Sequence, residues 1–232
     1  MSTRAARRPG RWPAWALALA VALSALLAAC GGSAKLTGTD LGQEPAPDFT
    51  LTDHRGQTVS LSQLRGKAVA LTFIYTHCPD ICPLITQHLA QAYAQLPKDA
   101  QARVALVAIT VDPARDTPEV LQAYSAQHGL ADNPHWFALT GDAETLAPVW
   151  ASYYIDPGAI MAGEHAADHG TPADGNDHAD QPDHPGMPAA GSGDLIHTDA
   201  IFLIDREGRW RVLLRSETDP QTIAKNLEIL AG

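Results

Sequence analysis

Residues 68–83 read AVALTFIYTHCPDICP and place two cysteines directly after an apolar run. The run Ala68–Tyr75 has the length and the β-branched or aromatic content of a buried strand. Leu84–Leu96 carries apolar side chains at helical spacing, so Cys82 is expected in the first turn of a helix. This unit of strand, Cys-x-x-x-Cys and helix is the most specific signal in the chain.

Cysteines at a strand-to-helix junction favour the thiolate form. Unpaired backbone N–H groups and the helix dipole stabilise negative charge there and lower a thiol pKa that is otherwise ~8.5. A thiolate attacks disulfides and also binds soft metals. Because Cys78 and Cys82 are one helical turn apart, both sulfurs can face the same way. The motif alone leaves redox chemistry and metal binding equally open.

On either side of this unit, strand patterns alternate with helix patterns. Phe49–Leu61 predicts a β-hairpin that turns at Asp53–Gln57. The later elements are expected to be a strand at Arg103–Val111, a helix at Glu119–His128 capped by Asp116 or Thr117, a strand at His135–Leu139, a helix at Ala143–Tyr153 capped by Asp142, hairpin strands at Ala200–Asp205 and Arg209–Arg215, and a helix at Pro220–Leu230. This order predicts one α/β domain, residues 47–232, with a central, mostly parallel sheet flanked by helices.

The N-terminal residues predict export. Basic residues precede the uncharged stretch Trp12–Ala29, so residues 1–29 are expected to be a signal peptide. The ending Leu27-Ala28-Ala29-Cys30 resembles a bacterial lipobox, which implies cleavage before Cys30 and lipid attachment to its sulfur. An uncleaved membrane anchor is the alternative. Residues 30–46 are then a linker, and the domain is expected to face the periplasm or the cell exterior as a membrane-anchored lipoprotein.

The charge balance excludes nucleic acid as a partner. Without the four arginines of the signal, 12 basic side chains face 26 acidic ones, a net charge of −14. Binding a phosphate backbone needs the opposite sign. An acidic surface suits a protein that handles cations, although it also serves solubility alone.

The cysteine count favours chemistry over structural cross-linking. If Cys30 carries lipid, Cys78 and Cys82 are the remaining pair of the three cysteines. A disulfide between them closes too small a ring to constrain much of the unfolded chain. The pair is therefore expected to act chemically, as a redox couple or as metal ligands.

Residues 159–193 are expected to be a flexible insertion in the domain. They are rich in Gly, Pro, Ala and Asp and have almost no large apolar side chain, so they cannot bury enough surface to fold alone. The insertion nevertheless contains Met161, His165, His169, His178, His184 and Met187. Imidazole and thioether groups suit copper, which predicts an auxiliary metal-capturing tract. Compositional drift in an exported loop is the alternative explanation.

The residues around the cysteines resemble the Sco/SenC family of membrane-tethered copper proteins with a thioredoxin fold. The motif Cys78-Pro79-Asp80-Ile81-Cys82-Pro83 follows Tyr75-Thr76. The resemblance continues at Phe49-Thr50-Leu51, Gly66-Lys67, Asp112-Pro113-Ala114-Arg115-Asp116-Thr117-Pro118, Leu139-Thr140-Gly141 and His197. It covers residues 47–232 apart from the insertion and implies a thioredoxin-like fold.

The resemblance implies a copper site made by Cys78, Cys82 and His197. Two thiolates and one imidazole form a three-coordinate set suited to Cu(I), and to Cu(II) if a further ligand is added. Thioredoxin-like reductases have a cis-proline before the corresponding strand, whereas this chain has Ile196-His197-Thr198 there. A ligand in that place favours metal binding over general disulfide reduction.

The implied function is a copper chaperone that delivers copper to, or prepares, the CuA site of cytochrome c oxidase subunit II. Other periplasmic copper chaperones or thiol reductases are the further partners that the resemblance implies. Two alternatives use the same cysteines: a membrane-tethered thiol–disulfide reductase, which would make the protein an enzyme, and a copper or redox sensor.

Other polar side chains are secondary candidates. Asp112 and Asp116 match the family's second motif and are expected to cap a helix or support the ligands, and His77 adjoins Cys78. The histidines expected at the surface or at helix ends are His54, His88, His128 and His135.

Overall fold

The computed structural model describes residues 35–158 and 199–232. Leu36–Gly232 forms one compact unit. Across the described ranges, no helix has the length and apolar character needed to cross a bilayer. The predicted signal peptide, residues 1–29, and the predicted insertion, residues 159–193, lie outside the described residues.

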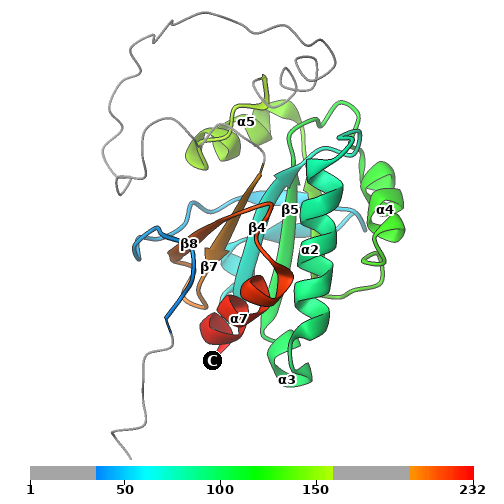
Figure 1. Cartoon of the computed structure of the whole chain (residues 1–232). Coiled ribbons are helices and arrows are strands. Elements are labelled where there is room, and N and C mark those ends of the chain that lie inside the picture. The colour runs from blue at the N-terminus through cyan, green and yellow to red at the C-terminus, as the bar shows by residue number, and fades with distance from the viewer. Residues whose placement is uncertain (1–34, 159–198) are drawn as a thin grey trace, which may run out of the picture. The chain divides into compact units, whose positions relative to one another are not determined.

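The described strands form one sheet in the order β1-β8-β7-β4-β5-β6-β2-β3 (Figure 1). The strands are β1 (Thr39–Asp40), β2 (Thr50–Asp53), β3 (Thr58–Ser60), β4 (Ala68–Ile74), β5 (Val104–Thr110), β6 (Trp136–Thr140), β7 (Ala200–Ile204) and β8 (Trp210–Arg215). Both predicted hairpins are confirmed, as β2–β3 and β7–β8.

The expectation of a mostly parallel sheet is wrong in one respect. β4 pairs parallel with β5, and β5 with β6, but every other neighbouring pair of these strands is antiparallel. Short turns join β2 to β3 and β7 to β8, and such turns can join only antiparallel strands, so each hairpin adds an antiparallel pair beside the parallel centre. The α/β class itself is confirmed.

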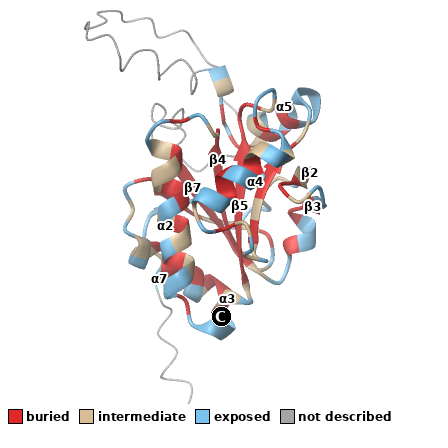
Figure 2. Ribbon diagram, turned by 90° about the vertical axis from the view of Figure 1, so that its right-hand side faces the viewer, coloured by how far each residue is buried: buried red, intermediate tan, exposed pale blue. Residues whose placement is uncertain are grey.

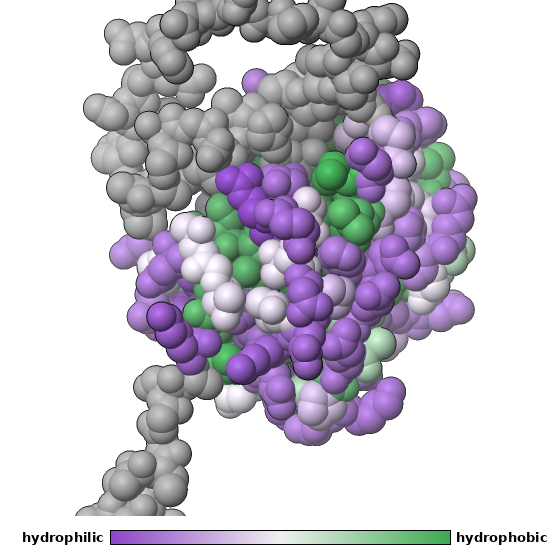
Figure 3. Space-filling view, in the orientation of Figure 1, coloured by the Kyte–Doolittle hydropathy of each residue, from purple (hydrophilic) through white to green (hydrophobic). Residues whose placement is uncertain are grey.

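The predicted helices are all present. They are α2 (Ile81–Gln95), α4 (Pro118–Gln127), α5 (Ala143–Ser152) and α7 (Pro220–Ala231), and two short elements that the pattern did not predict are η1 (Ser62–Leu64) and α3 (Lys98–Gln101). Helices α2 and α7 pack side by side against the sheet (Figure 1). The face that they present to solvent is mostly hydrophilic (Figure 3).

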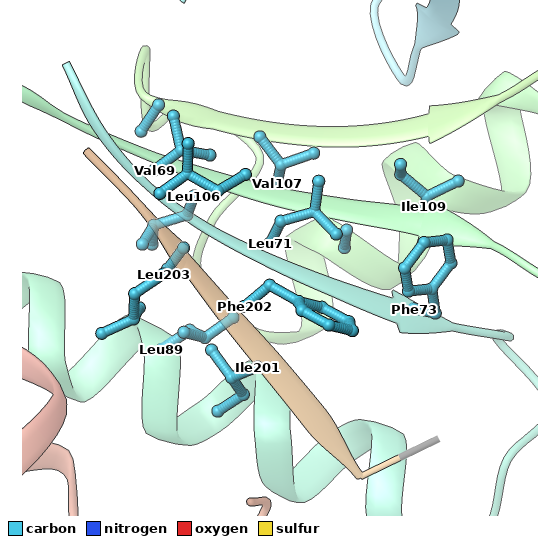
Figure 4. Close-up of a cluster of buried hydrophobic side chains, with 14 of the residues drawn as sticks. Val69, Leu71, Phe73, Leu89, Leu106, Val107, Ile109, Ile201, Phe202 and Leu203 are labelled. Carbon is cyan, nitrogen blue, oxygen red and sulfur yellow. The ribbon is translucent and has the colours of Figure 1, made fainter. Parts of the chain in front are cut away.

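The core lies along the central strands. Every residue of β4, β5 and β7 is buried, which is why their sequences are apolar runs without alternation (Figure 2). Figure 4 shows Leu71, Val107 and Phe202 among the side chains of this cluster. Burying one such side chain contributes about 1.5–3 kcal/mol, so these strands hold the loops at their ends in place.

The folded unit extends N-terminal of the boundary expected at residue 47. Thr39 and Asp40 form β1, which pairs with β8 at the edge of the sheet. Leu41 is buried, and the side-chain amide of Asn226 on α7 bonds the backbone of Thr37. Part of the predicted linker 30–46 is thus packed on the domain. A two-residue strand is too short to show an alternating pattern, so β1 could not be predicted from the sequence.

Candidate functional site

Cys78 and Cys82 lie where the chain leaves β4 and enters α2. Asp80 is the N-cap of α2, and its carboxylate accepts a hydrogen bond from the backbone N–H of Ile81. Cys82 is therefore in the first turn, as predicted, and its backbone N–H donates to the sulfur of Cys78 at 3.3 Å. The two sulfurs are not joined by a disulfide.

The two thiols have opposite acidity. A hydrogen bond with the Cys82 side chain is the main cause that lowers the pKa of Cys78 to about 6, and backbone N–H groups of Cys82 and Asp80 add to the effect. The same hydrogen bond, together with burial and the charge on Cys78, raises the pKa of Cys82 far above its usual value. Cys78 is 8% exposed and Cys82 is fully buried. At neutral pH the pair therefore consists of one thiolate and one thiol.

Asp116 fixes the loop that carries Cys78. Its buried carboxylate accepts hydrogen bonds from the backbone N–H of Thr76 at 3.3 Å and from the Thr76 hydroxyl at 2.5 Å. The hydroxyl of Thr110, at the end of β5, also donates to it at 2.6 Å. Asp116 thus ties the cysteine loop to the neighbouring strand. The cap of α4 is Thr117, whose side chain accepts from Val120, so the capping role expected for either residue belongs to Thr117.

Asp112 and His77 lie next to this network. Asp112 is buried and forms an ion pair with Arg115. The ring of His77 is within 3.1 Å of the Thr76 hydroxyl, at the exposed side of the loop. No role was predicted for Thr76 or Thr110, because the partner of a threonine hydroxyl is known only once the strands are aligned.

Several predicted site residues fall outside the described part of the chain. These are Cys30, Met161, His165, His169, His178, His184, Met187 and His197. Within residues 35–158 and 199–232, no three His, Cys, Asp or Glu side chains are placed together to hold a metal ion. The described part of the site thus contains two sulfur atoms, those of Cys78 and Cys82.

His54 is not the surface residue that the sequence predicted. It is 4% exposed, and its Nδ1 accepts a hydrogen bond from the backbone N–H of Ala138 at 3.3 Å. Its Nε2 has no hydrogen-bond partner in the described structure. Burial, followed by the charge of Arg55, lowers the pKa of His54. The turn around it suggested exposure, but β6 covers the ring.

A family model described as SCO1/SenC matches residues 38–172, more than half of the chain. Among curated proteins, the bovine mitochondrial protein SCO2 homolog is 40% identical over 109 residues, 47% of this chain and 40% of the relative. A putative copper-binding protein of Stutzerimonas stutzeri is 37% identical over 43% of this chain and 47% of the relative. The chain thus spans less than half the length of these two relatives.

The fold is that of solved Sco structures. A structure of Bradyrhizobium japonicum ScoI with copper bound superposes with a TM-score of 0.55 at 27% identity, over 80% of this chain and 99% of the other. The thioredoxin-like fold expected from the sequence is confirmed.

Proposed function

Because the chain belongs to the SCO1/SenC family, we propose that it is a copper chaperone that carries one copper ion on Cys78, Cys82 and His197. Copper is its cargo, because one relative is named a putative copper-binding protein and a structural neighbour has copper bound. The observation that supports this most is the close pair of buried sulfurs at the N-terminus of α2. Thiolates are soft ligands and favour Cu(I) over harder cations.

The described backbone supports His197 as the third ligand. The Thr72 hydroxyl on β4 donates to the carbonyl of Ala200 at 2.8 Å, which fixes the start of β7 beside the end of β4. The cysteine loop leaves β4 only a few residues later. His197 precedes Ala200 by three residues, a span of at most about 10 Å. This short span is what favours His197 as the imidazole that approaches the sulfurs.

Loading and release follow from the difference between the cysteines. The Cys78 thiolate is the more accessible sulfur and meets an incoming ion first. The buried Cys82 thiol then binds with loss of its proton, which passes to solvent. On delivery, a thiolate of the acceptor displaces one ligand while the other two hold the ion, so free copper is never released. A disulfide between the cysteines would supply neither thiolate, so loading requires the reduced pair.

The test is anaerobic Cu(I) binding by the reduced protein in competition with a chromogenic chelator. Wild type is expected to bind tightly, Cys78→Ser to lose at least about a hundredfold in affinity, and His197→Ala at least about tenfold, the lower end of what a lost supporting group costs a metal site. If wild type does not compete for Cu(I), or if His197→Ala binds equally well, the assignment is wrong.

The acidity of Cys78 favours thiol–disulfide exchange as a second candidate function. Its thiolate would attack a target disulfide, and the Cys82 thiol, losing its proton, would then attack the mixed disulfide. Two electrons pass to the target, and Cys78 and Cys82 end as a disulfide. This activity does not need an imidazole, so His197→Ala should keep it while losing copper. Equal loss of both activities would tie the exchange to the metal site.

Place and partners complete the proposal. Cytochrome c oxidase subunit II is the proposed acceptor of the copper, with other copper chaperones or thiol reductases acting upstream. Lipid on Cys30 is the proposed tether that keeps the domain at a membrane, outside the cytoplasm.

A further inference from the structure

We propose that an apolar hollow beside the cysteine loop is the docking site for the copper acceptor, and that it takes an apolar side chain of the acceptor flanked by lysine or arginine. This inference rests on the proposed function and adds to it the surface and the chemistry by which the partner is recognised.

The hollow has a volume of about 400 Å³, within the ~300–1,000 Å³ typical of ligand pockets. Its apolar walls come from the loop after β5, from both ends of α5 and from the chain after α5. These walls are Val111, Pro113, Ala114, Ala143, Trp150 and Pro157. The indole N–H of Trp150 donates to the carbonyl of Thr110 at 3.0 Å, which fixes the ring at the end of β5. The hollow is thus preformed.

The hollow and the cysteine loop lie at the same end of the sheet. The backbone N–H of Val111 donates to the carbonyl of Ile74 at 2.9 Å, so the wall of the hollow begins next to the residue where β4 ends. The loop after β5 that supplies Pro113 and Ala114 also supplies Asp116, which holds Thr76. Open α/β sheets bind ligands beyond the carboxyl ends of their parallel strands, and the cysteine loop after β4 and the loop after β5 both lie there (Figure 1).

The rim of the hollow is acidic. Asp112 and Asp142 line it, and Glu144 follows in the exposed first turn of α5. Arg115 is the basic residue next to the hollow, and it is paired with Asp112. No lysine or arginine follows until Arg206. An apolar floor with a carboxylate rim is complementary to an apolar side chain between cationic ones.

The position of the hollow beside the cysteine loop indicates that the copper acceptor occupies it. A protein that receives copper from Cys78 must bring its own thiolate to that sulfur, so it must cover the surface next to the cysteine loop. The hollow is part of that surface, and the partner's cations would approach the acidic rim at a rate that falls with salt.

The first test measures copper transfer. The full chain in detergent micelles, loaded with Cu(I), is mixed anaerobically with the reduced, metal-free soluble domain of oxidase subunit II. Ala143→Arg and Ala114→Arg put a cation into the hollow from two different loops. Ala126→Arg adds the same charge on the exposed surface of α4. Both hollow variants should slow transfer about tenfold, and the control less than about twofold, with Cu(I) affinity unchanged in all three. Equal rates in the hollow variants and the control would overturn the docking site.

The second test does not depend on copper. Indole N–H signals are followed by NMR while the metal-free acceptor domain is added to the metal-free, reduced chain. The Trp150 signal should shift, whereas that of Trp136, buried and bonded to Ser125, should not. No shift at Trp150 would overturn the inference even if copper binds. Failure of wild type to bind copper, with the Trp150 shift intact, would instead contradict the proposed cargo. A Trp150 signal that shifts on dilution in the absence of the acceptor would mean that a second copy of the chain occupies the hollow, and this result would overturn the docking proposal.

Discussion

At the scale of single residues, Cys78 and Cys82 share one motif but differ in environment. The Cys78 sulfur lies near the surface and accepts hydrogen bonds from backbone and side-chain groups, whereas the Cys82 sulfur is fully buried. A pKa for Cys78 of about 6 makes it the thiolate at neutral pH.

Alkylation by iodoacetamide tests this difference. The rate at Cys78 should rise about tenfold per pH unit below pH 6 and level off near pH 7, because only the thiolate reacts. Cys82 should remain unmodified in the folded, reduced protein, since its pKa is raised and it is buried. Mass spectrometry of peptides identifies the modified residue. A rate at Cys78 that still rises steeply between pH 7 and 9 would contradict the account.

His54 gives a second prediction at this scale. Its folded-state pKa lies below the ordinary value of 6.5. As the pH falls below 6.5, the unfolded chain therefore binds a proton that the folded chain resists, and the free energy of unfolding decreases until the folded pKa is passed. Urea unfolding at pH 8 and pH 5 measures the decrease.

The matched control is His54→Asn, whose side-chain oxygen can still accept from Ala138 but does not titrate. The decrease between pH 8 and pH 5 should be smaller in this variant. The remaining decrease belongs to Cys78, whose lowered pKa of about 6 is passed in this range, and to His128 and His135, whose pKa values burial also lowers. An identical decrease in both proteins would show that His54 does not contribute.

At the scale of elements, the end of α5 contains a strained residue. Tyr154 has φ of 59° and is the large apolar side chain most exposed among the described residues, at 40%. At the end of α5, the backbone N–H of Ile155 donates a hydrogen bond to the carbonyl of Trp150 at 2.8 Å. This bond requires Tyr154 to adopt the left-handed conformation that glycine prefers.

Tyr154→Gly should therefore raise the free energy of unfolding by up to about 1 kcal/mol, the left-handed cost of about 1–2 kcal/mol less the added entropy of glycine in the unfolded chain. Tyr154→Ala is the control, because it removes the ring but keeps the β-carbon. Chemical denaturation compares the two variants. Glycine no more stable than alanine would mean that this backbone is not strained.

Elements also show what the sequence can predict. The strands β4, β5 and β7 were found because both faces are buried, which leaves a continuous apolar run. Whether neighbouring strands run parallel or antiparallel was not predicted correctly, because a hydrophobic pattern does not encode which neighbour a strand pairs with. The cap at Asp142 was predicted, and that of α4 was narrowed to Asp116 or Thr117, because capping side chains bond within three residues. The bond between Asp116 and Thr76 joins residues 40 positions apart and needed the fold.

At the scale of the whole molecule, residues 159–193 are predicted to collect copper in addition to the main site. Replacing their metal-binding side chains, His to Gln and Met to Leu, should lower the copper bound per chain to about one ion without changing the tightest affinity. The replaced residues are Met161, His165, His169, His178, His184 and Met187. Metal analysis after dialysis gives the stoichiometry. An unchanged stoichiometry would make this tract a spacer.

The central claim is that copper is held by the two cysteines and His197, and X-ray absorption at the copper edge tests it most directly. In the reduced wild-type protein with one Cu(I) bound, the account predicts a first shell of two sulfur atoms and one imidazole nitrogen. In His197→Ala, the nitrogen scattering should disappear while both sulfurs remain. A nitrogen that persists in His197→Ala, or a wild-type shell without two sulfurs, would contradict the account.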